Sequence, residues 1–129
     1  MSDNNYVQRR RSFIFCPGNK PELLTKALNS GADMVCVDLE DAIIPQHKDI
    51  SRSKTLEAFK TASVPKGIET LIRINDINSE DGFKDIEALS SASNLPSGLM
   101  LPKIKTAEEI QKLNNRFIDA NININLHVI

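Results

Sequence analysis

The strongest constraint on the fold is an alternation of short apolar runs and amphipathic segments along the whole chain. Each apolar run is rich in Ile, Leu, Val or Phe, and a segment with apolar residues at helical spacing follows it. This alternation predicts a parallel β-sheet built from βα units. The predicted strands cover residues 13–16, 34–39, 70–74, 98–101 and about 122–129, with one helix in each interval.

Capping residues mark several helix ends. Asn19, with Glu22 three residues later, has the spacing of a capping box, and Gly31 suits the left-handed position after the helix. Thr106 and Glu109 repeat that spacing before the last helix. The inward apolar residues are expected to be Leu23, Leu24, Ala27 and Leu28 in the first helix; Leu56, Phe59 and Ala62 in a less regular helix near 50–62; Phe83, Ile86 and Leu89 in a helix starting near Glu80 or Asp81; and Ile110, Leu113 and Phe117 in the last.

Length and charge limit the domain count and the partners. The chain has 129 residues, 40% of them hydrophobic, which suffices for one domain with a core. Its 16 basic and 17 acidic side chains argue against nucleic acid as the main partner. No apolar run approaches the roughly 20 residues that span a bilayer, and no apolar signal core follows the polar N-terminus. We therefore expect a cytoplasmic protein without a membrane partner.

The cysteines and histidines show no site pattern. Cys16 and Cys36 lie inside apolar runs, where cysteine behaves as a small core residue. His47 falls in a predicted loop and His127 in the last predicted strand, and neither has a potential ligand partner nearby in sequence. We expect structural roles for all four residues.

Two architectures suit the alternation of strands and helices. An open doubly wound sheet should carry a nucleotide-binding loop, but the sequence has neither Gly-x-Gly-x-x-Gly nor a phosphate-binding loop motif. A (β/α)₈ barrel needs about 250 residues, so the chain would be roughly its first half. We predict an α/β fold of the (β/α)₈ TIM-barrel type. Residues 1–11 are expected to form a flexible N-terminal arm, and residues 12–129 a partial barrel domain truncated at its fifth strand.

Polar residues follow the predicted strands, where a barrel carries its functional groups. An arginine offers a fork for a carboxylate, and clustered carboxylates hold a hard cation such as Mg²⁺ directly or through its waters. Structural explanations compete, because Arg73 could pair with Asp41 or Asp76, Asp38 could cap a turn, and Lys103 could be an exposed loop cation. The candidates at the strand ends are Asn19, Asp38, Glu40, Asp41, Arg73 and Lys103.

The order of these motifs resembles the citrate lyase beta-subunit-like family, within the HpcH/HpaI aldolase and citrate lyase superfamily. The most specific piece is Asp-Leu-Glu-Asp-Ala at 38–42, and the resemblance extends over almost all of the chain from residue 10. The other matching segments are 10–22, 30–33, 72–75 and 100–104, together with Pro45 and Lys48.

The resemblance implies a (β/α)₈ barrel in a homo-oligomer that cleaves or forms carbon–carbon bonds with Mg²⁺. The substrates would be citryl-, malyl- or related CoA-type thioesters, which give an acyl thioester and a 2-oxo acid. By the same resemblance, Arg73 would bind the oxo-acid carboxylate and oxyanion, while Glu40 and Asp41 would hold waters of the Mg²⁺ shell. The direct metal ligands would lie beyond Ile129. Asn19 and Lys103 are further substrate-binding candidates, and Asp38 is a candidate at the same rim without an assigned role.

Two other functions stay open from the sequence. The chain could be a catalytically inactive half-barrel that acts as a binding or subunit-interaction module. It could also belong with the related aldolases that act on free hydroxy-oxo acids, because the loops that choose between thioester and free acid lie mostly beyond Ile129.

Overall fold

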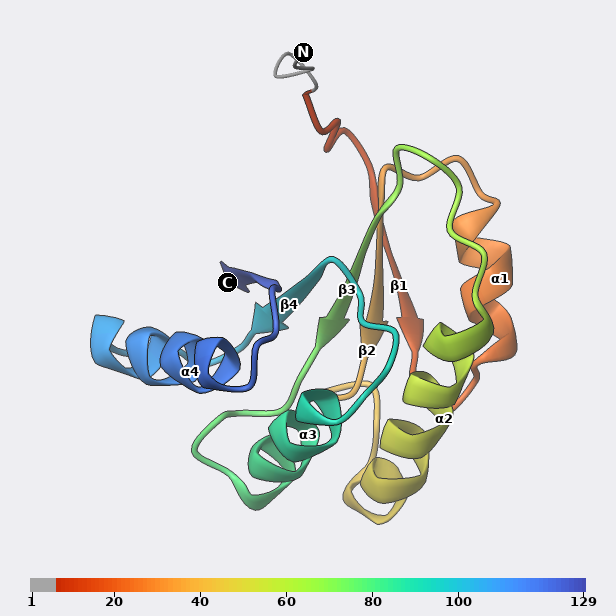
Figure 1. The fold of residues 1–129 in the computed structure, drawn as a ribbon. Coiled ribbons are helices and arrows are strands. Elements are labelled where there is room, and N and C mark those ends of the chain that lie inside the picture. Colours follow the sequence, from red (N-terminus) through yellow and green to blue (C-terminus); the bar gives the residue numbers. More distant parts are fainter. Residues whose placement is uncertain (1–6) are drawn as a thin grey trace.

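The protein forms one parallel β-sheet with its helices arranged in an arc along one side (Figure 1). The computed structural model describes residues 7–129, so residues 1–6 of the predicted arm lie outside the described residues. The strands follow one another in chain order across the sheet, which confirms the predicted βα units. The elements are β1 (Phe13–Pro17), α1 (Glu22–Leu28), β2 (Met34–Asp38), a 3₁₀ turn η1 (Pro45–His47), α2 (Lys48–Thr61), β3 (Glu69–Arg73), α3 (Glu80–Ser90), β4 (Gly98–Leu101), α4 (Ala107–Asp119) and β5 (Asn125–Val128).

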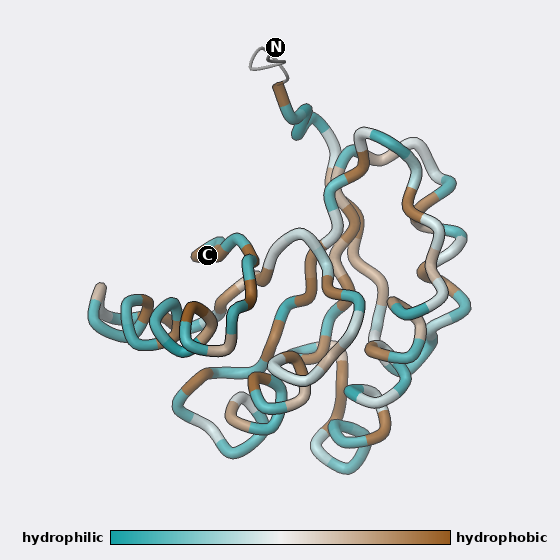
Figure 2. Tube along the Cα trace, viewed as in Figure 1, coloured by the Kyte–Doolittle hydropathy of each residue, from teal (hydrophilic) through white to brown (hydrophobic). Residues whose placement is uncertain are grey.

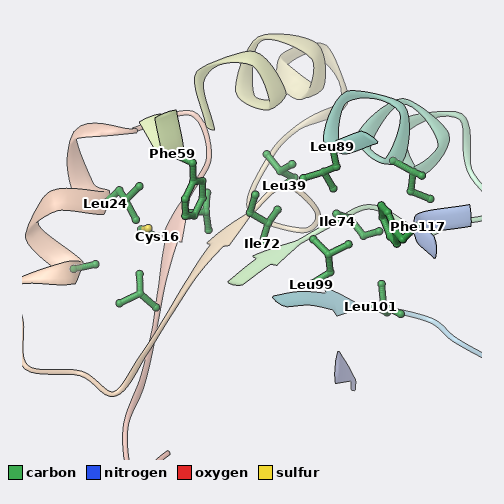
Figure 3. Packing of buried hydrophobic residues seen from close by; sticks show 14 of the residues in the cluster. Cys16, Leu24, Leu39, Phe59, Ile72, Ile74, Leu89, Leu99, Leu101 and Phe117 are labelled. Atoms are coloured by element: carbon green, nitrogen blue, oxygen red, sulfur yellow. The ribbon is translucent and has the colours of Figure 1, made fainter. Parts of the chain in front are cut away.

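The main core lies between the sheet and the helices. Alternate strand residues point to the helices, and apolar residues gather along the strands in the middle of the sheet (Figure 2). Leu24 and Phe59 pack above the β1–β2 side, while Leu89 and Phe117 pack above β3 and β4 (Figure 3). The strand residues of this core include Cys16, Val35, Val37, Ile72, Ile74, Leu99 and Leu101.

The opposite surface of the sheet, here called the inner face, has its own apolar cluster. Met34, Cys36, Leu71 and Met100 form this cluster and are all buried. Because side chains alternate along a strand, Asp38 and Arg73 continue the inner face toward the C-terminal ends of β2 and β3. The inner face is therefore apolar in its middle and charged at the C-terminal ends of β2 and β3.

The helix boundaries test the predicted caps. Thr106 and Glu109 form the expected capping box at α4, with reciprocal hydrogen bonds between side chain and backbone. The predicted cap at Asn19 is wrong, because α1 begins only at Glu22 and Pro21 occupies the N-cap position. Gly31 has the expected positive φ, 90°.

The sequence prediction for α2 is only partly confirmed. Phe59 is buried as expected, but the other buried residues of this helix are Ser51, Arg52 and Thr55, which are polar. The predicted inward residues Leu56 and Ala62 are partly buried and pack against the core with Phe59, so the apolar period holds for the C-terminal half of the helix. It did not predict that polar side chains are buried in the N-terminal half. The helix also begins two residues earlier than predicted, at Lys48.

Two ion pairs fasten the segment before β1 to the N-terminal edge of the sheet. Arg10 makes two hydrogen bonds with Glu69, at 2.8 and 3.1 Å. Arg11 makes two with Asp33, at 3.0 and 3.1 Å, and its backbone N–H donates a third at 2.7 Å. These bonds from Arg11 hold the pKa of the Asp33 carboxyl at about 2.

Both cysteines are buried and unpaired, as expected. Burial raises the pKa of the Cys16 thiol to about 11 and raises that of Cys36 as well. Both therefore stay protonated at neutral pH, which suits core residues rather than nucleophiles. Within residues 7–129, no helix has the length and apolar character needed to cross a membrane.

The Arg11–Asp33 pair predicts a specific pH dependence of stability. The pKa of Asp33 is lower in the folded protein than in the unfolded chain, so its contribution is complete above about pH 4 and is lost as the pH falls toward 2. We expect Asp33→Asn to lower Tm by a few degrees at pH 7 and the gap from the parent to close near pH 2. Thermal unfolding followed by circular dichroism checks this. Asp119→Asn, at an exposed site on α4, should show no such convergence, and a pH-independent gap for Asp33→Asn would contradict the assignment.

Candidate functional site

The C-terminal ends of β1 to β4 meet at one edge of the sheet. Pro17, Asp38, Arg73 and Met100 stand side by side in the register of neighbouring strands. Functional groups of barrel-type folds gather at this edge, because the βα loops of successive strands open there together. The residues after these strands therefore face a common region, as the sequence predicts.

Asp38 and Arg73 form the central pair. The guanidinium donates from Nε to one carboxylate oxygen and from Nη2 to the other, both at 2.8 Å. Asp38 is 3% exposed, so this bidentate pair is largely shielded from water. Arg73 also lies over the Phe15 ring, with 5.0 Å between Cζ and the ring centroid.

The same Asp38 carboxylate organises the loop after β2. One oxygen accepts from the backbone N–H of Glu40 and the other from that of Ala42, both at 2.9 Å. Burial alone would raise the pKa of Asp38, but the hydrogen bonds from Arg73 and these two N–H groups outweigh it and lower the pKa. Asp38 thus stays ionised, and it links Arg73 to the loop that carries Glu40. The hydrogen bonds to Asp38 correspondingly raise the pKa of Arg73, despite its partial burial.

Glu40 lies between two cations. Its Oε1 is 3.6 Å from Arg73 Nε, and its Oε2 is 3.4 Å from Lys103 Nζ. Glu40 is 6% exposed, and its Oε2 has no hydrogen-bond partner among the described residues. Lys103 has φ of 58°, a left-handed conformation that is uncommon for a residue with a side chain. A buried carboxylate oxygen therefore has unused hydrogen-bonding capacity beside a strained loop.

Asp41 and Asn19 lie at the margin of this cluster. Asp41 is exposed, and its charge adds to the forces that raise the pKa of Arg73. Asn19 is partly buried, and its Oδ1 has no hydrogen-bond partner among residues 7–129. Arg73 forms its bidentate ion pair with Asp38. The alternative ion pairs of Arg73 with Asp41 or Asp76, considered from the sequence, are therefore wrong.

The sequence patterns did not identify Asp38 as the partner of Arg73, nor the buried residues between α2 and α3 that lie next to the site. Asp38 shares strand parity with Met34 and Cys36, which placed it on the same face as Arg73 and could have identified the pair. Arg52 and Asp85, which form a buried ion pair between α2 and α3, carried a weaker signal in the polar spacing of α2.

The carboxylates of this site are suited to binding the water molecules around a magnesium ion, not to binding the ion directly. Nowhere in the described chain do three His, Cys, Asp or Glu side chains group closely enough to hold a metal ion. The Oε2 of Glu40, which has no hydrogen bond among the described residues, and the exposed carboxylate of Asp41 can each accept a hydrogen bond from metal-bound water. Hard oxygen donors of this kind suit Mg²⁺.

Comparison with curated proteins places similar sequences among CoA-related lyases. Over 120 residues the chain is 34% identical to the mitochondrial citramalyl-CoA lyase of Rattus norvegicus, covering 91% of this chain and 34% of that protein. It is also 34% identical to the citrate lyase subunit beta of Leuconostoc mesenteroides subsp. cremoris, covering 90% and 37%. The chain therefore spans about a third of the length of these relatives.

Solved structures agree with the fold. RipC from Yersinia pestis superposes with a TM-score of 0.69 at 27% identity, over 92% of this chain and 46% of that one. A citrate lyase beta subunit from Mycobacterium tuberculosis, complexed with oxaloacetate and magnesium, gives 0.64 at 32% identity, over 81% and 44%. The fold is thus of the TIM-barrel type, covering part of a barrel. The family model of HpcH/HpaI aldolase/citrate lyase matches residues 11–125, so the chain belongs to this family.

Proposed function

We propose that this chain supplies the oxo-acid-binding part of a magnesium-dependent carbon–carbon lyase. The proposed substrate is a hydroxyacyl-CoA-type thioester, and the products are an acyl thioester and a 2-oxo acid. The observation that carries the proposal is the bidentate Asp38–Arg73 pair at the strand ends, beside a Glu40 oxygen that is ion-paired with Lys103 but has no hydrogen bond among the described residues. Relatives named as lyases of citramalyl-CoA and citrate support the reaction class.

Arg73 has donors left for a ligand. Its bonds to Asp38 use Nε and Nη2, so among residues 7–129 the Nη1 group has no acceptor. A guanidinium held along one edge presents its remaining N–H groups in a fixed direction, which suits the carboxylate of an oxo acid. Asp38 thereby orients Arg73 and keeps its charge close to the binding region.

Glu40 and Asp41 are proposed to hold water molecules of a bound Mg²⁺. When bound, the ion stabilises negative charge on the oxo-acid oxygen. Lys103 lies beside Glu40 and offsets the buried negative charge of its carboxylate. We further propose that Asn19 and Lys103 contact substrate from the loops after β1 and β4, that residues 12–129 form the partial barrel domain, and that the complete protein is a homo-oligomer.

Arg73→Lys tests the carboxylate-binding role. Lysine keeps the charge but loses the fork, so oxaloacetate should bind roughly 10- to 100-fold more weakly in the presence of Mg²⁺. The reference is the oxaloacetate affinity of the protein isolated from its native source, measured by calorimetric titration. The intact mass of that protein is recorded first. Arg9→Lys, at an exposed position before β1, should leave the affinity unchanged. Unchanged affinity in Arg73→Lys would refute the role, and absence of binding in the parent protein would favour an interaction module.

Glu40→Gln tests the outer-shell role. The amide replaces one carboxylate oxygen by a donor, so Mg²⁺ affinity should fall roughly 10- to 100-fold, as for other residues that act through metal-bound ligands. The measurement is the rise of Tm with Mg²⁺ concentration, which reports affinity without any turnover. Glu108→Gln, on the exposed first turn of α4, serves as the matched control. Equal Mg²⁺ responses in the two variants would exclude Glu40 from the metal site.

A further inference from the structure

Helix α2 turns a polar stripe toward the candidate site. Lys48, Arg52 and Thr55 are spaced four and three residues apart, so they share one face of the helix. Arg52 and Thr55 are 8% and 2% exposed, which is unusual burial for an arginine on a helix that covers a sheet. A helix in this position ordinarily buries an apolar stripe, so the polar side chains need another explanation.

The two ends of this stripe bind the loops after β1 and β2. Thr55 Oγ1 donates to the carbonyl oxygen of Gly18 at 3.3 Å, beside Asn19. Lys48 Nζ donates to the carbonyl oxygens of Leu39 and Glu40, the first at 2.9 Å. One helix therefore holds the backbone of both loops that carry candidate site residues.

The middle of the stripe reaches the loop after β3 through a buried relay. Arg52 Nε donates to Asp85 Oδ1 on α3 at 2.6 Å. Asp85 is 1% exposed, and its Oδ2 accepts from both the backbone N–H and the side-chain Nδ2 of Asn75, each at 2.8 Å. Asn75 lies two residues after Arg73. The guanidinium of Arg52 is thus connected to the strand end that carries Arg73.

Further contacts make this relay stiff. The Arg52 guanidinium also binds Asp49 at 2.7 Å and Asp81 at 3.2 Å, so three carboxylates fix its orientation. On α3, a Cβ added to Gly82 would lie 1.9 Å from the carbonyl oxygen of Asp76, which shows how closely the helix approaches the loop after β3. A displacement of α3 would therefore move this loop with it.

We propose that Arg52 is a positioning residue for Arg73 and acts through Asp85 and Asn75, with Lys48 and Thr55 holding the two neighbouring loops. The functional meaning rests on the proposed oxo-acid binding by Arg73, but the positioning itself does not require a ligand. A purely stabilising contact between α2 and α3 would be made at lower cost by apolar side chains, because buried ion pairs lose much of their attraction to desolvation. The hydrogen bonds of the polar stripe instead reach the loops after β1, β2 and β3, and because these bonds are directional they define where the three loops lie.

Hydrogen exchange of individual side-chain and backbone N–H groups tests the proposal in the ¹⁵N-labelled chain. Arg52→Met keeps the apolar stem and removes the relay, so exchange at Arg73 Nε–H and Asn75 N–H should accelerate roughly tenfold or more. The Nε–H of Arg11, bound to Asp33 at the opposite edge of the sheet, should keep its rate. Arg52→Lys should restore slow exchange in part, since one cation remains beside Asp85.

Phe59→Leu is the matched control for global destabilisation. Phe59 lies on the same helix and is 5% exposed in the apolar core, so this variant loosens α2 without touching the relay. The proposal is overturned if Arg52→Met changes the exchange of Arg73 no more than Phe59→Leu does. Should Arg52→Met not fold, Thr55→Val tests the contact of the stripe with the first loop. The Gly18 N–H donates to the backbone carbonyl oxygen of Asp38 at 2.9 Å, and it should exchange several-fold faster in this variant. Unchanged Gly18 exchange would then overturn it.

Binding measurements separate this proposal from the proposed function. Oxaloacetate with Mg²⁺ should bind Arg52→Met more weakly than Phe59→Leu by roughly tenfold. If the parent chain binds no oxaloacetate, the proposed function is refuted, whereas the exchange rates still decide whether Arg52 positions the strand end.

Discussion

The bidentate contact between Asp38 and Arg73 joins neighbouring strands at the edge where the βα loops open. The Asp38 carboxylate accepts four hydrogen bonds, two from the guanidinium and two from the backbone of the following loop. A carboxylate with every lone-pair direction occupied is ionised and immobile, so it can hold a cation at a chosen place. The position of Glu40 follows from the same carboxylate, because its backbone N–H is one of the four donors.

The two edges of the sheet carry charge for different purposes. At the N-terminal edge, Arg10 and Arg11 satisfy Glu69 and Asp33, and these pairs fasten the chain before β1. At the C-terminal edge the pairing is incomplete, since Glu40 keeps an oxygen without a hydrogen bond. Unused hydrogen-bonding capacity in a buried group costs free energy, so it is expected where a ligand completes the network.

Support for this edge comes from the helix that fits an amphipathic pattern least well. The N-terminal half of the buried face of α2 is polar because it contacts loop carbonyls and a carboxylate, whereas the buried face of α4 is apolar and packs on strands. An irregular apolar period in a helix that covers a sheet can therefore indicate supporting contacts to a site.

The sequence by itself determined the order of strands and helices, the cap of α4 and the edge where polar residues gather, because apolar period and capping chemistry are local properties. Parallel strands place every strand end at one edge, so the neighbourhood of Glu40, Arg73 and Lys103 also followed from the order of elements. Only the tertiary structure decided that Arg73 pairs with Asp38, and that α2 directs Arg52 inward. Those choices depend on strand register and on the burial of charges between α2 and α3. Strand parity and the polar spacing of α2 show which residues are involved, but local patterns do not specify which partner each one takes.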